Sequence, residues 1–442
     1  MNASPRKPSF FRAPSNIFWA AFAIRLLCIL IGHTFRVRSL DDHFDYGFEA
    51  GRIARSLVLG HGYSSPFNGN SGPTAWLPPL YPLLMALAFK LFGIYSQGAA
   101  AFLMILDSLA SALVAPAVYE IAARCLDAFG LARRNATKAA PVALWSAWAW
   151  ALHPAAMQFA VHWLWETAIS TTLFTWALVF ALRLRGTGEQ TGTRPAQARM
   201  SAWGIYGLLW GVLALSNTTL LICWPGVTAW ILWPRLGFLR GWAGAALSFL
   251  LVWLCLTPWI VRNERALHAF VPARSNFGIE LWNASVWYHD AIPWGTALTL
   301  APDDAEFRQF TRMGEVRFAH MRQQQALSNI KAHPELYAKF TAYRVQYFWY
   351  IWPHAADRMT VSEALRLLNY GVLSTTGLFG LALALRRRVP GAWLFFWVFL
   401  LSPLPYYLVT VQARFRHPLE PLICVLTVYL FRSTEARPAR NA

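Results

Sequence analysis

The chain has 442 residues, of which 56% are hydrophobic, 15% are aromatic and 14% are charged. These proportions exclude an ordinary soluble globular protein, and the 23 tryptophans are typical of a protein with many membrane interfaces. The formal net charge of +18 would suit a nucleic-acid partner. The basic residues, however, form short clusters between apolar stretches, and no nucleic-acid-binding motif accompanies them. We therefore expect an integral membrane protein without a nucleic-acid partner.

Apolar stretches suited to membrane helices, which take about 20 residues each, recur along the chain. Clusters of Lys and Arg lie in alternate connections, which is where cytoplasmic loops carry them. The protein is therefore predicted to be all-α, in the plasma (inner) membrane, with both termini cytoplasmic. About ten spans are expected, near 17–34, 99–123, 140–155, 158–182, 203–217, 218–233, 241–260, 367–385, 391–409 and 417–432.

These spans leave two long segments outside the membrane, the first outer loop at 35–98 and a second segment at 261–366. Within the second segment, residues 302–350 are polar with a helical pattern, which predicts a small helical extracytoplasmic cap. We expect residues 1–432 to form one membrane domain and residues 433–442 to form a cytoplasmic tail.

The first outer loop is predicted to hold two helices that lie in the membrane interface. Over 44–59, apolar residues including Phe48, Ile53 and Leu57 recur at the spacing of an amphipathic interfacial helix. A loop rich in Gly, Pro and Asn follows. The stretch "LLMALAFKLFG" is then apolar and helical in pattern, but it is too short to span a bilayer.

The first of these helices carries a cluster of acids, in "DDHFDYGFEAGRIARSL" at 41–57. Asp42, Asp45 and Glu49 are spaced i, i+3 and i+7, so they share one helix face. A solvated face, or a helix N-terminus that favours acids, accounts for such a cluster, above all for Asp41 and Asp42. Alternatively, a carboxyl whose pKa is raised at a dry interface serves as a general base for a hydroxyl nucleophile. Asp45 and Glu49 are the first candidates for that base, and Asp42 is the third.

Two further acids lie within expected spans, where a charge is costly and a function or a named partner is the usual explanation. Glu166, near the outer end of the fourth span, is a candidate catalytic residue; the alternative is a hydrogen bond to a neighbouring helix or to His162. Asp107 lies among small residues and is expected to join helices. The sequence suggests no role for the intramembrane Arg25.

Basic side chains occur in two short motifs of the outer regions. "RFRHP", at the start of the last span, supplies Arg414, Arg416 and His417. Guanidinium groups suit bidentate contacts with a phosphate, although long basic side chains also extend to lipid headgroups. "RSNFG" offers Arg274 and Asn276 to the same predicted site.

The chain lacks the common cofactor motifs. No group of His, Cys and Asp residues has the spacing of a zinc site, and no Walker or dinucleotide-binding glycine pattern occurs. We therefore predict no metal site and no cofactor, and leave open whether a divalent cation assists. The same absence argues against a transferase that uses ATP or a nucleotide sugar through a cytoplasmic domain.

Several stretches resemble a known family. The acidic helix followed by "IARSLVLGHGYSSPF" and "GPTAWLPPLYP…KLFG" resembles the first outer loop of the polytopic glycosyltransferase C superfamily. Within it, the chain is similar to the family-39 branch, which includes protein O-mannosyltransferases and lipid A aminoarabinose transferases. "LHPAAMQFAVHWLWET", "ARSNFGIELWN" and "ARFRHPLEPL" agree with this resemblance, which extends over most of residues 15–432.

The resemblance implies transfer of a sugar from a polyprenyl-phosphate donor to an acceptor hydroxyl of a lipid, glycan or protein at the outer membrane face. It also implies that an acid of the first outer loop is the base. Counting back from Gly60 places this acid at Asp45, with Glu49 where the family has a tyrosine. Counting from Tyr46 favours Asp42. Glu166 corresponds to a family acid that faces the first loop.

The remaining candidates complete a predicted donor site. Arg414 and Arg416 would hold the departing lipid phosphate, and Trp76 and Tyr81 of "GPTAWLPPLYP" would offer ring faces to a sugar or an isoprenoid. Attack by the acceptor would invert the anomeric carbon. The alternative function is a polytopic transporter or a lipid-linked sugar flippase, for which paired half-repeats with acids at the bilayer midplane are typical.

Overall fold

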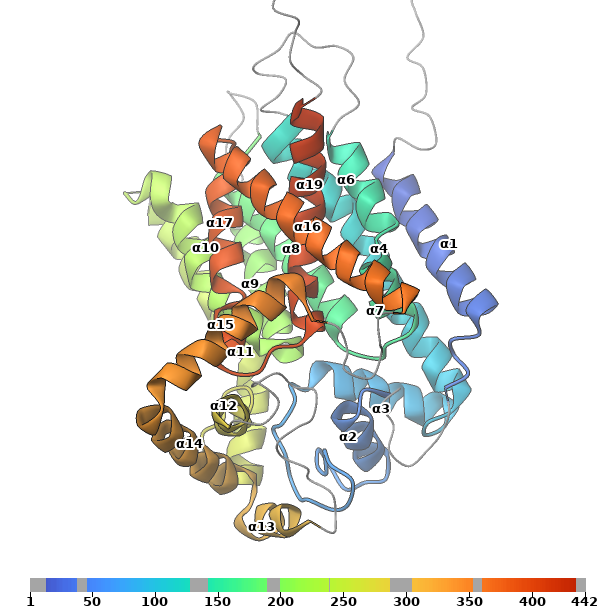
Figure 1. The fold of residues 1–442 in the computed structure, drawn as a ribbon, viewed down its shortest axis with the longest axis vertical. Coiled ribbons are helices and arrows are strands. Elements are labelled where there is room, and N and C mark those ends of the chain that lie inside the picture. The colour runs from blue at the N-terminus through green and yellow to red at the C-terminus, as the bar shows by residue number, and fades with distance from the viewer. Residues whose placement is uncertain are drawn as a thin grey trace, which may run out of the picture.

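The computed structural model describes residues 13–37, 46–127, 142–188, 199–237, 239–286, 304–352 and 360–434. Over these residues the secondary structure is helical, apart from one isolated β-bridge between Ser64 and Pro73. The expected all-α class is therefore confirmed. Figure 1 shows a bundle of long helices with a layer of shorter helices across one end.

Among the described residues, five helical segments of the bundle are long and apolar enough to cross a membrane, which makes this a multi-pass membrane protein. They are α1 (Pro14–Gly32), α4 with the π-helical turn that follows it (Gln97–Asp127), α8 (Thr167–Arg185), α11 (Leu239–Leu267) and α16 (Val361–Arg386). The other bundle helices are shorter: α6 (Val142–Ala151), α7 (Pro154–Val161), α9 (Met200–Ser216), α10 (Cys223–Leu232), α17 (Ala392–Leu401), α18 (Leu404–Leu408) and α19 (Glu420–Thr434).

The expected number of about ten spans is not confirmed, and three expected spans are interrupted: 140–155 between α6 and α7, 158–182 between α7 and α8, and 391–409 between α17 and α18. The stretch 158–182 is not continuous, because α7 ends at Val161 and α8 begins at Thr167. The turn between them carries Glu166, which occupies the N-cap position of α8. Composition alone does not reveal this break, since the turn residues are themselves largely apolar.

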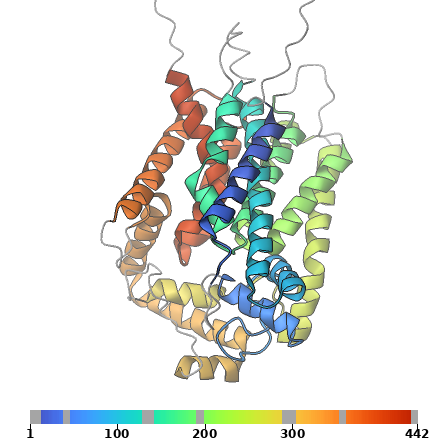
Figure 2. The same ribbon diagram turned by 90° about the vertical axis from the view of Figure 1, so that its right-hand side faces the viewer.

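The layer consists of α2 (Glu49–Val58), α3 (Leu80–Phe92), α12 (Phe277–Ser285), α13 (Ala305–Met313) and α14 (Glu315–Ala332). In Figure 2 it lies across the end of the bundle opposite to the ends of α1 and α19 that adjoin the two chain termini. Helix α15 (Pro334–Tyr350) runs from the layer back into the bundle, where Tyr347 and Phe348 join the main core. Helix α3 leaves Leu83, Leu87 and Leu91 exposed on one face, as an interfacial helix does.

Helix ends follow local sequence. The Ser96 hydroxyl accepts a hydrogen bond from the Ala99 N–H at 3.1 Å and caps α4. Thr360 caps α16 in the same way. Helix α8 ends at Gly186, whose φ of 75° is readily adopted only by glycine.

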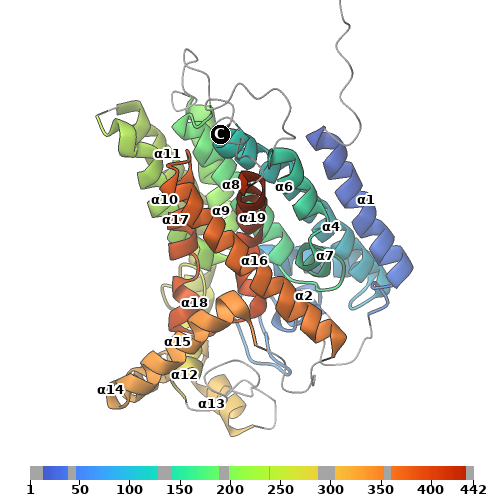
Figure 3. The same ribbon diagram turned by 45° about the horizontal axis from the view of Figure 1, so that its top comes forward.

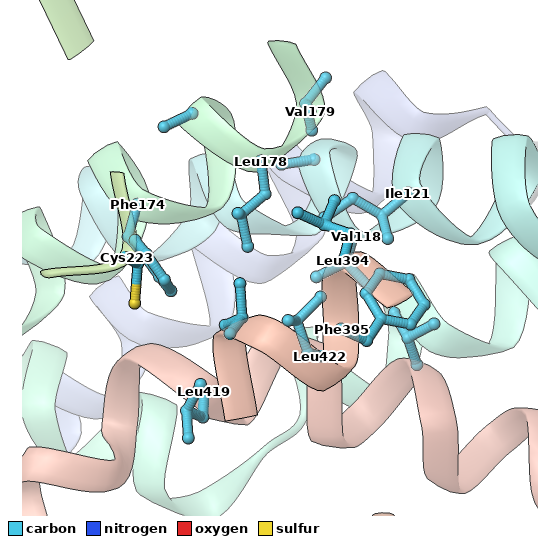
Figure 4. Packing of buried hydrophobic residues seen from close by; sticks show 14 of the residues in the cluster. Val118, Ile121, Phe174, Leu178, Val179, Cys223, Leu394, Phe395, Leu419 and Leu422 are labelled. Carbon is cyan, nitrogen blue, oxygen red and sulfur yellow. The ribbon is translucent and has the colours of Figure 1, made fainter. Parts of the chain in front are cut away.

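The main core lies between α4, α8, α17 and α19. Figure 4 shows part of it, including Val118, Ile121, Phe174, Leu178, Leu394, Leu419 and Leu422. Small residues bring some helix backbones together, as is usual between membrane helices. A Cβ added at Gly207 of α9 would lie 2.7 Å from Cα of Ser248 in α11, so these two helices are in close contact.

Arg25, for which the sequence suggests no role, joins three helices inside the bundle. Its guanidinium donates hydrogen bonds to the Ser111 hydroxyl of α4 at 3.2 Å and to the Ala151 carbonyl of α6 at 3.1 Å. A third bond, of 3.0 Å, goes to the Ala21 carbonyl in its own helix. Arg25 therefore acts as a buried polar cross-link.

The contact between α16 and α19 provides a test of this packing. A Cβ at Gly380 of α16 would collide with the backbone of Leu426, whereas a Cβ at Gly371 of the same helix meets no atom within 4 Å. We expect Gly380→Ala to destabilise the protein by about 1–3 kcal/mol through overpacking. The matched control Gly371→Ala should be neutral or slightly stabilising, because alanine favours a helix. Thermal unfolding in detergent measures both, and equal stability of the two variants would contradict the close contact.

Candidate functional site

Glu49 lies where the layer meets the bundle, in the first turn of α2, and is half-buried. Burial raises the pKa of its carboxyl, while the charges of Arg414 and Arg274 act in the opposite direction and that of Glu280 adds to the increase. These four residues, here called the Glu49 cluster, come from α2, α12 and the connections before α12 and α19. Two carboxylates and two guanidiniums therefore share one electrostatic environment.

A close backbone contact places α2 beside the turn that carries Glu166. Gly47 precedes α2 with a φ of +69°, and a Cβ there would lie 2.6 Å from the Leu164 carbonyl oxygen and 2.9 Å from Cδ1 of Trp165. Only glycine fits this position without displacing the turn. The first outer loop and the start of α8 are thus held together without an intervening side chain.

Glu166 is half-buried, and no hydrogen bond joins its carboxylate to the residues that the structure describes. The expected alternative, a bond to His162, is therefore not seen there. Its carboxylate is near enough to interact electrostatically with Tyr406 of α18 and with the pair formed by Tyr81 and Asp107. Glu166 is thus an acid near the end of the bundle that faces the layer.

Arg414 stacks on the turn between α7 and α8. Its guanidinium lies 4.0 Å from the centre of the Trp165 ring, a cation–π contact, and its buried Nε lacks a hydrogen-bond partner among the described residues. Since Trp165 also contacts Gly47, the same ring touches the entrance to α2 and the guanidinium. The Arg414 side chain is half-buried and retains donors for a ligand.

Hydrogen bonds hold Arg274 and Glu280, the other two members of the cluster, in place. Arg274 Nε donates to the Trp76 carbonyl at 3.0 Å. Glu280 accepts hydrogen bonds from the buried Asn276 amide at 3.1 Å and from the Thr410 hydroxyl at 2.5 Å. No local sequence pattern marks Glu280, although it lies in "ARSNFGIELWN". Asn276 therefore orients a carboxylate of the cluster.

Arg416 does not join Arg414, so the expected pair of arginines differs from the structure. Its side chain is 0% exposed and forms an ion pair with Glu420 at 2.6 Å, and it lies 3.9 Å from the centre of the Tyr370 ring. The reason is local geometry, because residues 413–419 form a 3₁₀-helix. With three residues per turn, side chains two positions apart point in different directions.

His417 is also buried, contrary to its expected place in the phosphate motif, and so are Trp76 and Tyr81, contrary to the expectation that they offer ring faces to a ligand. His417 packs 4.7 Å from the Phe159 ring centre. The Trp76 indole packs against Phe67 at 4.8 Å within the layer. The Tyr81 hydroxyl donates to Asp107 at 2.7 Å, so Asp107 joins α3 to α4, as expected for an acid between helices. Asp41, Asp42 and Asp45 lie outside the described residues.

Glu315, at the start of α14, connects the loops that form this side of the site. Its buried carboxylate accepts hydrogen bonds from the Ala75 N–H at 2.7 Å and from the hydroxyls of Thr74 and Ser275. Burial raises the pKa of this carboxyl, although the three donors act against the increase. No sequence pattern marks Glu315, because its partners are distant along the chain. It fixes the loop that ends at Arg274.

The described residues contain no group of three or more His, Cys, Asp or Glu side chains placed to hold a metal ion. Within the Glu49 cluster the carboxylates are Glu49 and Glu280 alone. A catalytic zinc site typically uses three protein ligands, and the cluster supplies two carboxylates.

The arrangement of helices is similar to that of a solved membrane enzyme, the oligosaccharyltransferase of Archaeoglobus fulgidus. Its apo structure has a TM-score of 0.54 and 14% identity, with 98% of this chain and 53% of that chain covered. A structure of the same enzyme, AglB, in complex with an inhibitory peptide and a dolichol-phosphate has a TM-score of 0.54 and 15% identity, covering 97% and 52%. This chain therefore spans about half the length of that protein.

ArnT from Cupriavidus metallidurans, bound to undecaprenyl phosphate, has a TM-score of 0.38 and 17% identity, with 95% of this chain and 78% of that chain covered. No protein-family model matches the chain, and no curated protein matches it. The likeness to the oligosaccharyltransferase shows that the two proteins share the fold of this helical bundle.

The role of Glu315 gives a prediction about the stability of the layer. Glu315→Ala should cost about 1–3 kcal/mol, because it leaves the buried Ala75 N–H unpaired. Because the folded pKa of Glu315 is raised, its contribution is complete below the unfolded pKa of about 4.3 and is lost as pH rises through the folded value. Glu315→Gln, which keeps an acceptor oxygen, should remove that decline. Thermal unfolding from pH 4 to 8 measures both effects, and an unchanged pH dependence in Glu315→Gln would contradict the assignment.

Proposed function

We propose that this chain is a membrane glycosyltransferase that transfers a sugar from a polyprenyl-phosphate donor to an acceptor hydroxyl, with inversion, at the extracytoplasmic face. The observation that supports it most directly is the Glu49 cluster, where a half-buried carboxylate of raised pKa lies within electrostatic range of two guanidiniums from distant segments. The oligosaccharyltransferase of the same fold has been solved with a dolichol-phosphate, a lipid phosphate of the proposed donor class.

Glu49 is the proposed general base, because a raised pKa suits a carboxylate for accepting the proton of a hydroxyl. The acceptor oxygen then forms a bond to the anomeric carbon while the bond from that carbon to the phosphate oxygen breaks. Asp45 and Asp42 remain candidates for the same role, outside the described residues. Glu166, on the turn that contacts the entrance to α2, is the proposed second acid of the site and would orient the acceptor.

Arg414 and Arg274 are the proposed phosphate ligands. Guanidinium groups stabilise the negative charge that develops on a departing phosphate, and their planar geometry allows two parallel hydrogen bonds. The Trp165 ring fixes the plane of Arg414. Arg416 takes no part in this proposal, since Glu420 already pairs with it.

Another structure of the A. fulgidus enzyme contains zinc and sulfate. In this chain Glu49 and Glu280 do not form a group of three ligands among the described residues. The steps proposed here are those that the chain's own side chains would carry out.

The pH dependence of turnover tests the base. Activity should fall as pH decreases through the raised pKa of Glu49, and Glu49→Gln should lower kcat by about 10²–10⁴-fold with normal membrane abundance. Glu280→Gln removes a like charge, so it should shift the acidic limb of the profile to lower pH. Glu264→Gln, which removes an exposed acid at the end of α11, is the charge-matched control and should leave the limb in place.

The measurement uses a synthetic polyprenyl-phosphate sugar, chosen from the lipid-linked sugar that accumulates in a deletion strain. Near-native turnover of Glu49→Gln would exclude Glu49 as the base and leave Asp45 and Asp42. An acidic limb that is identical in Glu280→Gln and wild type would show that the two carboxylates do not interact.

The arginines separate a phosphate site from a purely structural one. Arg414→Lys keeps the charge but loses the planar group, so kcat should fall by about 10²-fold while the donor KM changes less. Arg416→Lys should instead lower the unfolding temperature, with kcat per folded molecule retained, because its partners are protein groups. Turnover and thermal unfolding are measured on both variants. Full activity of Arg414→Lys would remove it from the site.

A further inference from the structure

A cavity lies at the end of the bundle opposite to the layer. It has a volume of about 430 Å³ and is formed by the end of α8 with its following loop, the end of α10 and the residues that begin α17. Figure 3 shows α10, α17 and the start of α11 at this end. The Glu49 cluster lies at the other end, so the cavity does not depend on the proposed function.

Arg185 provides the charge of this cavity. Its guanidinium lies 4.1 Å from the centre of the Trp230 ring and donates to the Trp230 carbonyl, and no carboxylate pairs with it in the part of the chain that the structure describes. Arg183, two residues earlier in the same helix, differs because it forms an ion pair with Glu120. Arg185 is therefore a half-buried cation that retains donors on the cavity wall.

The surroundings of the cavity add positive charge. Arg386, Arg387 and Arg388 are exposed and lead directly into Val389 and Gly391 on the cavity wall. None of the three pairs with a described carboxylate. An anionic group that enters the cavity therefore meets Arg185 and a positive rim.

Exposed tryptophans place the cavity at the depth of lipid headgroups. Trp393 lines the cavity and is 59% exposed, while Trp233 and Trp242, at the adjoining ends of α10 and α11, are 73% and 51% exposed. Tryptophan is enriched where a membrane protein meets the lipid–water interface. The glycines of the cavity also have a structural reason, since a Cβ at Gly188 would lie 2.7 Å from the Arg124 carbonyl oxygen.

We propose that this cavity binds the phosphate headgroup of an anionic membrane lipid, with Arg185 as its principal ligand. The guanidinium suits bidentate contact with a phosphate, and the Trp230 ring holds its plane. The volume is within the range of small-molecule sites. Basic pockets between membrane helices are a known means of binding anionic headgroups.

The experiment measures lipid binding to the full chain, purified in detergent, by native mass spectrometry and thermal unfolding. Phosphatidylglycerol should bind to wild type and raise its unfolding temperature, whereas phosphatidylcholine should not. Arg185→Gln should lower the affinity for phosphatidylglycerol at least tenfold. Arg240→Gln, which removes an exposed cation at the same end that does not line the cavity, is the matched control and should bind as wild type does.

Three outcomes would overturn the proposal: undiminished binding by Arg185→Gln, an equal loss in Arg240→Gln, or equal binding of the two lipids. Inorganic phosphate is tested alone, and a full thermal shift with it would assign the cavity to a soluble anion instead of a lipid. If Arg185→Gln does not yield folded protein, Arg185→Lys replaces it. Lysine keeps the charge without the planar group, so binding should weaken by several-fold, and wild-type affinity would reject the site.

Discussion

The Glu315 carboxylate determines how the layer is assembled. It accepts hydrogen bonds from Thr74, Ala75 and Ser275, so it joins the first outer loop, the connection after α11 and the start of α14. A buried carboxyl with that many donors is costly to leave unpaired and therefore fixes one arrangement of the loops. This arrangement also sets the position of Arg274. Arg274 precedes Ser275 in the chain, and its side chain donates a hydrogen bond to the carbonyl of Trp76, which is next to Ala75.

The bundle uses buried arginines in a comparable way. Arg25, Arg344 and Arg416 are all 0% exposed, and each bonds to backbone carbonyls of other segments. Arg416 also has the carboxylate of Glu420, to which His153 Nε2 lies within 3.1 Å. Between apolar helices, association has little hydrophobic driving force, so polar contacts and close packing of small residues specify which helices meet.

The sequence predicts well those helices that hydropathy and periodicity define locally. The long apolar stretches that became α1, α4 and α11 are found where periodicity and hydropathy place them, as are the short helix α3 and the polar helices α13 and α14. These features depend on residues close together in the chain. The break between α7 and α8 was missed because its residues do not lower the apolar content of the stretch.

The candidate site was predictable only in part, because it depends on contacts between distant segments. Glu49, Arg274 and Arg414 were singled out by residue type, and the structure places them in one cluster. Glu280 and Glu315 lack a local pattern, since their partners lie elsewhere in the chain. Spacing suggested that Arg414 and Arg416 act together, whereas the 3₁₀ geometry separates them.

The missing side chain at Gly47 has a mechanical consequence. The backbone there rests directly on Leu164 and Trp165, and the Trp165 ring in turn contacts the Arg414 guanidinium. Gly47 has no side chain that could absorb a displacement at this contact, and packed interiors transmit strain. A shift of α2 along the membrane surface therefore moves the indole and the guanidinium with it. The position of the proposed base, Glu49, is consequently coupled to that of a proposed phosphate ligand, Arg414.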